Sequence, residues 1–135
     1  NLRSELSKED WDRLRGPVLD RAGRRCEICG GRGIEYPVEC HEVWEYDDAE
    51  HVQRLAGLVA LCPACHEAKH MGYATSQGRG GQARAHLARV NRWSMEMAEL
   101  YLEGVFEQWS RRSQHEWTLD LSWLRQLGVD VTPGR

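Results

Sequence analysis

Four cysteines lie in two pairs of identical spacing, Cys26-x-x-Cys29 and Cys62-x-x-Cys65. Each pair offers two thiolates across a tight turn, and two such turns supply the four sulfur ligands of a tetrahedral zinc ion. Disulfides or a redox-active dithiol are the alternative, but no thioredoxin-like βαβ pattern surrounds either pair, and intracellular chains seldom keep disulfides. The spacing therefore predicts a structural zinc, whose binding contributes on the order of 10 kcal/mol to folding.

Three histidines and a fifth cysteine lie between and just beyond these pairs. His66 directly follows the predicted ligand Cys65, and His70 comes four residues later, so both imidazoles share one face of a predicted short helix. A pair at this spacing is a common grip for a metal ion, and an ordinary surface pair is the alternative. His41 follows Cys40 upstream and is the third candidate.

The motifs CEICG, ECHEVW and GLVALCPACHEAKH, within about Trp11 to Gly72, resemble those of the HNH, or ββα-metal, endonucleases. In that family a general-base histidine ends a first strand, an asparagine lies in the loop, and metal-binding histidine lies on the short helix that follows. Many members surround this motif with two CxxC pairs. The resemblance implies a zinc-stabilised ββα-metal core. With the flanking N-terminal helix and the mostly helical C-terminal tail that the sequence itself predicts, the expected fold class is α+β.

The resemblance also implies a role for each histidine. His41 would be the general base that deprotonates the attacking water, a task that suits histidine because its pKa lies near working pH. His66 and His70 would hold a second divalent cation, Mg²⁺, Mn²⁺, Zn²⁺ or Ni²⁺, against the scissile phosphate. The implied reaction is hydrolysis of DNA phosphodiester bonds to 5′-phosphate and 3′-hydroxyl ends, with RNA as the other candidate substrate.

Two positions depart from the family pattern. Cys40 stands where the family has Asp or His; as a metal ligand it would favour zinc or another soft ion, and as a buried bystander it would leave this position to water. Gly57, nine residues before His66, stands where the family has asparagine. Either another group, such as His51 or a backbone carbonyl, orients the base, or the enzyme is slow. The alternative function is a catalytically degenerate, zinc-stabilised nucleic-acid-binding module.

Charge is segregated along a chain whose net charge is −3. The acidic balance argues weakly against nucleic acid, because phosphate contacts need Lys and Arg. Positions 35–50 hold seven acids and no Lys or Arg, while positions 73–92 hold four arginines and no acid. These arginines are the predicted nucleic-acid contacts: Arg79, Arg84, Arg89 and Arg92. Five carboxylates near His41 are expected to be mostly solvated, with one available to complete the metal shell: Glu39, Glu42, Glu45, Asp47 and Asp48.

Hydrophobic periodicity and caps predict the elements that must position these side chains. Positions 7–22 predict a helix that begins at a capping serine and is kinked or split at Pro17. Positions 34–44 predict a hairpin, 45–53 a loop or short helix, and 55–61 a buried strand or turn. A short helix is expected to start at the second cysteine pair.

The rest of the chain predicts a tail outside the motif. Positions 73–82 are polar and glycine-rich, which predicts a flexible connection, and positions 83–135 predict a helical C-terminal extension in which Ser94 caps the longest helix. Three of the six tryptophans lie between Trp109 and Trp123. They either pack the tail onto the core or stack on bases.

The whole chain, 1–135, is expected to form one domain, with its core over 7–72. A soluble, cytoplasmic protein without membrane partners is expected, because no apolar run approaches the roughly 18 residues of a membrane span. The missing initiator Met leaves room for an upstream domain, and a homodimer through the C-terminal helices would turn a nicking site into a double-strand cutter. His86 and His115 have no partners at ligand spacing and are expected to be structural or surface residues.

Overall fold

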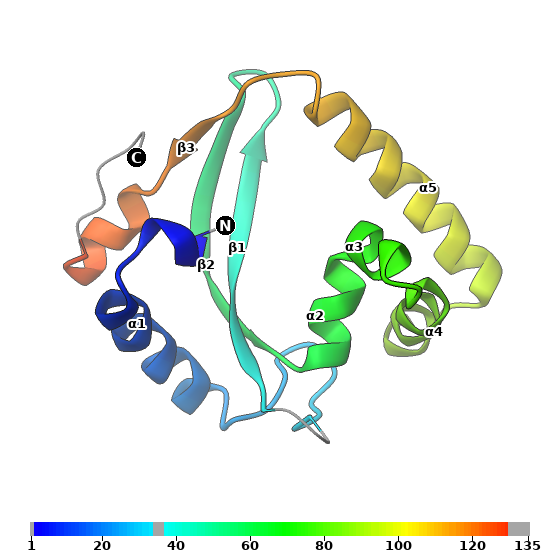
Figure 1. Ribbon diagram of the computed structural model, residues 1–135, viewed down its shortest axis with the longest axis horizontal. Coiled ribbons are helices and arrows are strands. Elements are labelled where there is room, and N and C mark those ends of the chain that lie inside the picture. The colour runs from blue at the N-terminus through cyan, green and yellow to red at the C-terminus, as the bar shows by residue number, and fades with distance from the viewer. Residues whose placement is uncertain (1, 34–36, 130–135) are drawn as a thin grey trace.

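The computed structural model describes residues 2–33 and 37–129, and its centre is a long antiparallel hairpin (Figure 1). The hairpin consists of β1, Glu39–Asp47, and β2, Val52–Leu61. A short strand from near the end of the chain, β3, Thr118–Asp120, pairs with β2 in parallel, so the sheet order is β1-β2-β3. The protein is therefore a mixed α+β fold with a small sheet.

The helix α1, Lys8–Arg21, begins where its sequence predicts. The hydroxyl of Ser7 accepts a hydrogen bond from the backbone amide of Asp10 at 3.1 Å, which satisfies one of the free amides at the helix start. Pro17 lies inside the helix, which continues to Arg21 and is not split there. One face of the helix is buried: Trp11, Leu14, Val18 and Leu19.

The hairpin lies further along the chain than the sequence predicts. β1 continues to Asp47 and β2 starts at Val52, so most of the predicted loop or short helix over 45–53 is strand, and the turn occupies 48–51. Positions 34–36 of the hairpin predicted over 34–44 lie outside the described residues. β1 is polar because it is mostly exposed, while β2 buries the side chains of the core: Leu55, Leu58, Ala60 and Leu61.

Four helices follow β2 and lie on the opposite side of the hairpin from α1 (Figure 1): α2, Pro63–Lys69; α3, Met71–Ser76; α4, Gly80–Asn91; and α5, Met95–Arg112. The predicted flexible connection over 73–82 is instead mostly helical. Gly80 is buried, and a Cβ atom there would lie 3.0 Å from Thr75 Oγ1 and 2.6 Å from Arg84 Nη1. Glycine leaves room at this position for the close approach of α3 and α4.

Two apolar clusters form the core. The main cluster joins α1, the hairpin and η2, Ser122–Leu127, and it includes three cysteines of the CxxC pairs. The second cluster is small and lies among α3, α4 and α5: Met71, Ala74, Ala83 and Leu102. Among the described residues, no helix has the length and apolar character needed to cross a membrane.

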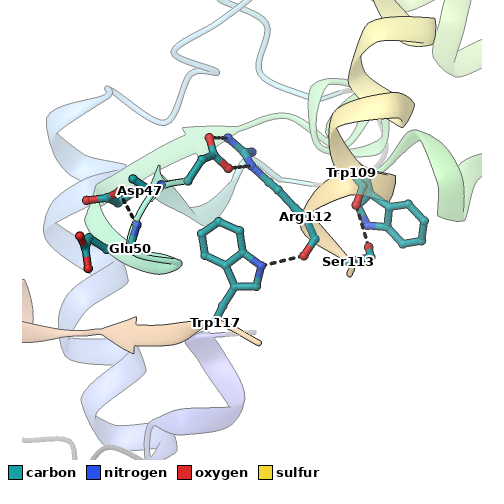
Figure 2. A network of polar contacts seen from close by, with 8 residues as sticks. Asp47, Glu50, Trp109, Arg112, Ser113 and Trp117 are labelled. Carbon is teal, nitrogen blue, oxygen red and sulfur yellow. Dashed lines mark hydrogen bonds and ion pairs between the residues drawn. The ribbon is translucent and has the colours of Figure 1, made fainter. Parts of the chain in front are cut away.

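The far end of α5 is attached to the tip of the hairpin, as Figure 2 shows. Arg112 donates two hydrogen bonds to the Asp48 carboxylate, at 2.9 and 3.1 Å, and its guanidinium carbon lies 4.0 Å from the centre of the Tyr46 ring. The indole of Trp117 donates to the backbone carbonyl of Arg112 at 2.8 Å. These contacts, which we call the tip clamp, fix the C-terminal end of α5 to the tip of the hairpin.

Candidate metal centres

The four predicted zinc ligands form one cluster, with all four sulfur atoms within 4.8 Å of one another. The sulfurs of Cys29 and Cys62 are 3.6 Å apart. Two sulfurs on one tetrahedral zinc ion lie about 3.8 Å apart for Zn–S bonds of about 2.3 Å. The cysteines are free thiols, so the disulfide alternative has no support. This cluster, called the cysteine site below, fits a structural zinc.

The backbone turns aim the sulfurs inward. The amide of Cys29 donates to Cys26 Sγ at 3.5 Å, and the amide of Cys65 donates to Cys62 Sγ at 3.4 Å. Cys62 is also the N-cap residue of α2, and Pro63 takes the first helical position, where a missing amide hydrogen costs nothing. The CxxC spacing therefore builds each half of the cysteine site locally.

The thiols of the cysteine site differ in how readily they ionise without a cation. Burial opposes ionisation of Cys26, yet amides of Cys29, Cys62 and Ile28 outweigh it and lower the pKa of this thiol to about 7. Burial, reinforced by neighbouring thiols, raises the pKa of Cys65, and burial also raises that of Cys62. A bound cation is the group that lets coordinating thiols ionise together.

A second cluster, called the histidine site below, joins β1 to α2. The ligand nitrogens of His41, His66 and His70 all lie within 4.8 Å of one another. The Nε2 atoms of His41 and His70 are 2.9 Å apart. Two nitrogens on a tetrahedral zinc lie about 3.3 Å apart for Zn–N bonds of about 2.0 Å. The structure therefore brings together all three predicted histidines in an arrangement that could hold a metal ion.

Hydrogen bonds set which nitrogen of two imidazoles is available. His41 Nδ1 donates to the backbone carbonyl of Glu42 at 2.7 Å, and since a carbonyl only accepts, Nε2 carries the lone pair. His66 Nδ1 lies 3.1 Å from a carboxylate oxygen of Glu39, which leaves its Nε2 for a metal. Such outer partners commonly orient metal-binding and catalytic histidines.

Burial keeps two of the imidazoles neutral. The His41 side chain is only 13% exposed. Desolvation, with a smaller contribution from His66, lowers the pKa of His41, and desolvation together with the other two histidines lowers the pKa of His70. Both pKa values fall from an ordinary value of 6.5, so both rings are neutral at pH 7 and able to take a proton or a metal ion.

The structure does not bring Cys40 to the histidines. In the part of the chain that is described, this residue belongs to neither candidate metal cluster. Its side chain is partly buried and packs against the main core, and burial raises the pKa of the thiol to about 11. A protonated thiol in an apolar setting fits the prediction of a buried bystander better than that of a metal ligand.

Of the two predicted substitutes for the family asparagine, a backbone carbonyl, that of Glu42, contacts His41, whereas His51 lies far from it. His51 is in the hairpin turn, where its ring stacks on His115 at 4.1 Å. The strand register separates it from His41 by the length of β1, about 20 Å at about 3.3 Å per residue. Gly57 lies opposite Val43 within β2, next to a register shift, and an added Cβ would meet no atom within 4 Å.

Two of the five predicted carboxylates lie near the histidine site. Glu39 contacts His66 as described, and Glu42 Oε1 lies 3.9 Å from His41 Nε2 with its side chain 14% exposed. The other three have partners elsewhere: Glu45 with Arg54, Asp48 with Arg112, and Asp47 with the backbone amides of the hairpin turn. Glu42 is therefore the carboxylate best placed to complete a metal shell.

The four predicted nucleic-acid contacts divide into two kinds. Arg79 pairs with Glu67 on α2, and Arg84 pairs with Glu99 on α5 at 3.1 Å, so both tie helices together. Arg89 and Arg92 are exposed on the C-terminal half of α4 and just beyond it. These two remain available to phosphates.

One residue near the cysteine site was not predicted to be there. His86 Nε2, on α4, lies 3.1 Å from Cys65 Sγ, within reach of an N–H···S hydrogen bond. Such a bond spreads the negative charge of a metal-bound thiolate. Its sequence position gives no signal, because the contact depends on how α4 packs on α2.

Comparisons of this chain with protein-family models, with curated proteins and with solved structures found no match. The two candidate metal centres are therefore the features of the structure that can support a functional proposal.

Proposed function

We propose that this chain is a metal-dependent endonuclease of the HNH, or ββα-metal, kind, and that it hydrolyses phosphodiester bonds in DNA. The observation that carries the proposal is the meeting of His41 from β1 with His66 and His70 from α2, all within 4.8 Å. The order of a hairpin followed by a short helix also agrees with the core expected of that family.

His41 has the geometry of a general base. Its Nδ1–H is held by the Glu42 carbonyl, so its Nε2 can accept a proton from a water molecule. The resulting hydroxide oxygen bonds to phosphorus, the bond to the 3′ oxygen breaks, and that oxygen takes a proton from solvent. A divalent cation held by His66 and His70 would stabilise the added negative charge on the phosphate.

The cysteine site supports this arrangement without taking part in the chemistry. Cys65 immediately precedes His66 on α2, and Cys62 directly follows β2 and caps that helix. A zinc bound there would fix the start of α2 against the hairpin, and four protein ligands would leave it no open position for substrate. Its role in the proposal is structural.

Gly57 supports a second candidate, a nucleic-acid-binding module without chemistry. It provides no side chain where the family has an orienting asparagine, and the candidate substitute His51 stacks at the opposite end of β1. A base oriented only by its own backbone contact would be less well fixed. This candidate predicts binding of nucleic acid without cutting.

A plasmid-nicking assay with Mg²⁺, Mn²⁺, Zn²⁺ and Ni²⁺ tests the proposal. We expect wild type to nick with at least one metal, and His41→Ala and His66→Ala to lose about 100-fold or more, the typical contribution of a positioned acid–base group. His115→Ala is the matched control, since this histidine stacks at the hairpin tip. If wild type cuts no better than His41→Ala with every metal, the nuclease proposal fails.

A further inference from the structure

A cleft of about 810 Å³ lies between α5 and the layer formed by α2, α3 and α4. One wall, on α5, carries aromatic rings: Tyr101, Phe106 and Trp109. The facing wall carries Lys69, His70 and Tyr73. Because His70 belongs to the histidine site as well, the cleft opens directly beside the proposed catalytic centre.

The aromatic rings of this cleft are left in solvent. The exposed fraction is 70% for Tyr73, 68% for Trp109 and 51% for Tyr101. α5 contributes only Ala98 and Leu102 to the buried residues, so its aromatic face adds little to the core. Figure 2 shows the Trp109 indole pointing away from Trp117 and the tip clamp. Large apolar side chains gathered and exposed in this way mark a binding surface.

The charge of the cleft points to the kind of ligand. The described lining includes one cation, Lys69, and contains no Asp or Glu. This stands out in a chain of net charge −3. A polyanion with flat apolar groups complements both the aromatic rings and the charge of the cleft. An acidic protein surface would offer fewer rings to stack on.

We propose that the cleft binds unpaired nucleobases of a single-stranded segment whose backbone runs into the histidine site. The inference deepens the proposed function, on which it rests for the direction of the strand, by naming single-stranded or locally opened nucleic acid as the substrate class. Aromatic rings stack on any base, so such a cleft tolerates many sequences. Its volume suits small ligand-sized groups such as individual bases and is too small for a duplex.

Fluorescence anisotropy with a labelled 12-nucleotide single strand of mixed sequence, and with the matching duplex, tests the proposal. The measurement is made without added divalent cation, so binding is observed apart from cutting. We expect wild type to bind the single strand more tightly than the duplex. Trp109→Ala weakens single-strand binding about tenfold, the loss typical of one stacked base, and Trp109→Phe keeps most of the affinity.

Two further variants sharpen the comparison. Leu100 lies on α5, is 67% exposed and does not line the cleft, so Leu100→Ala is the matched control and keeps wild-type affinity. Tyr73→Ala removes a ring from the opposite wall and weakens binding in the same direction as Trp109→Ala. Circular dichroism of each variant checks that the fold is intact, as expected for such exposed positions.

The outcomes separate this proposal from the nuclease proposal. If the protein binds single strands in a way that depends on Trp109 but nicks no plasmid, the cleft proposal is supported and the nuclease proposal is wrong. If the protein nicks plasmid but Trp109→Ala keeps the wild-type affinity for single strands, the cleft proposal is wrong. It is also wrong if wild type prefers the duplex. If sedimentation finds that wild type is a dimer and Trp109→Ala is a monomer, these rings bind a second copy of the chain. That result also overturns the cleft proposal.

Discussion

Neighbouring residues of β1 point to opposite faces of the hairpin, and this alternation separates Cys40 from His41. His41 faces α2 and meets two further imidazoles, while Cys40 packs against the main core. The thiol therefore stays protonated at neutral pH, because burial raises its pKa to about 11. Five cysteines occur in the chain, and only four have the geometry of a metal site.

Cys40→Ser should leave both metal sites and any nicking activity unchanged, because its sulfur contacts neither cluster. The serine hydroxyl would be partly buried in an apolar setting, so we expect the free energy of unfolding to fall by about 1–3 kcal/mol. Urea unfolding followed by tryptophan fluorescence and metal analysis of the purified protein measure the two effects. Cys62→Ser is the control that loses zinc; loss of the second ion in Cys40→Ser would instead make this thiol a ligand.

Local geometry decides which of the site residues can be predicted from the sequence. Two cysteines separated by two residues meet across one turn, and His66 and His70 meet across one turn of helix, so spacing alone predicts each pair. His86 reaches Cys65 only through the packing of α4 on α2. No periodicity in the sequence carries that information.

Among the elements, those with local signals are predicted and those that depend on distant pairing are not. Ser7 and Ser94 cap α1 and α5 as predicted, each accepting a hydrogen bond from the amide three residues on. The end of β1, over 45–47, is predicted to be a loop or short helix because it is acidic, and it becomes a strand through its ladder with β2. β3 is only three residues long and pairs with a strand more than sixty residues away, so its sequence gives little signal.

The tip clamp holds the C-terminal end of α5 to the tip of the hairpin. Arg112 contributes its stem and guanidinium to Tyr46 as well as two hydrogen bonds to Asp48. Its side chain is 23% exposed, whereas that of Asp48 is 61% exposed. The ion pair is therefore screened by solvent, and the stacking on Tyr46 carries a comparable share of the interaction.

A double-mutant cycle of Arg112→Ala and Asp48→Ala should separate these contributions. We expect a small coupling energy that shrinks in 1 M NaCl, and a larger loss of unfolding free energy for Arg112→Ala because it also removes the contact with Tyr46. Urea unfolding at two salt concentrations measures both. Arg111→Ala is the matched control, since Arg111 is exposed and forms its ion pair along the helix with Glu107. If Arg111→Ala and Arg112→Ala lower the free energy of unfolding equally, the tip clamp does not contribute to stability.

At the scale of the whole molecule, the cysteine site joins the two sides of the hairpin. Cys26 and Cys29 follow α1 on one side, and Cys62 and Cys65 begin α2 on the other. Three of these cysteines belong to the main apolar cluster, while the helices beyond α2 have only a small cluster of their own. A metal at the cysteine site would therefore orient the whole helical layer, including the histidines of α2.

The purified protein should contain one tightly bound zinc that is retained in His66→Ala and His70→Ala, together with a weaker second ion that both variants lose. Metal analysis after dialysis measures this. Removing the tight zinc with a chelator should unfold much of the chain, because binding of a structural zinc contributes on the order of 10 kcal/mol. Circular dichroism and nicking are then expected to fall together, although no residue of the histidine site has been changed.

Returning Zn²⁺ to the metal-free chain should restore both signals, whereas Mg²⁺ should restore neither, because thiolates select soft ions over hard ones. Chelator treatment that leaves the circular dichroism spectrum intact would contradict a scaffold role for the cysteine site. Two zinc ions held equally tightly, both surviving in a protein that does not nick, would make the histidine site a second structural centre. The relative affinity of the two ions thus decides whether the three histidines act on a substrate or hold the hairpin to α2.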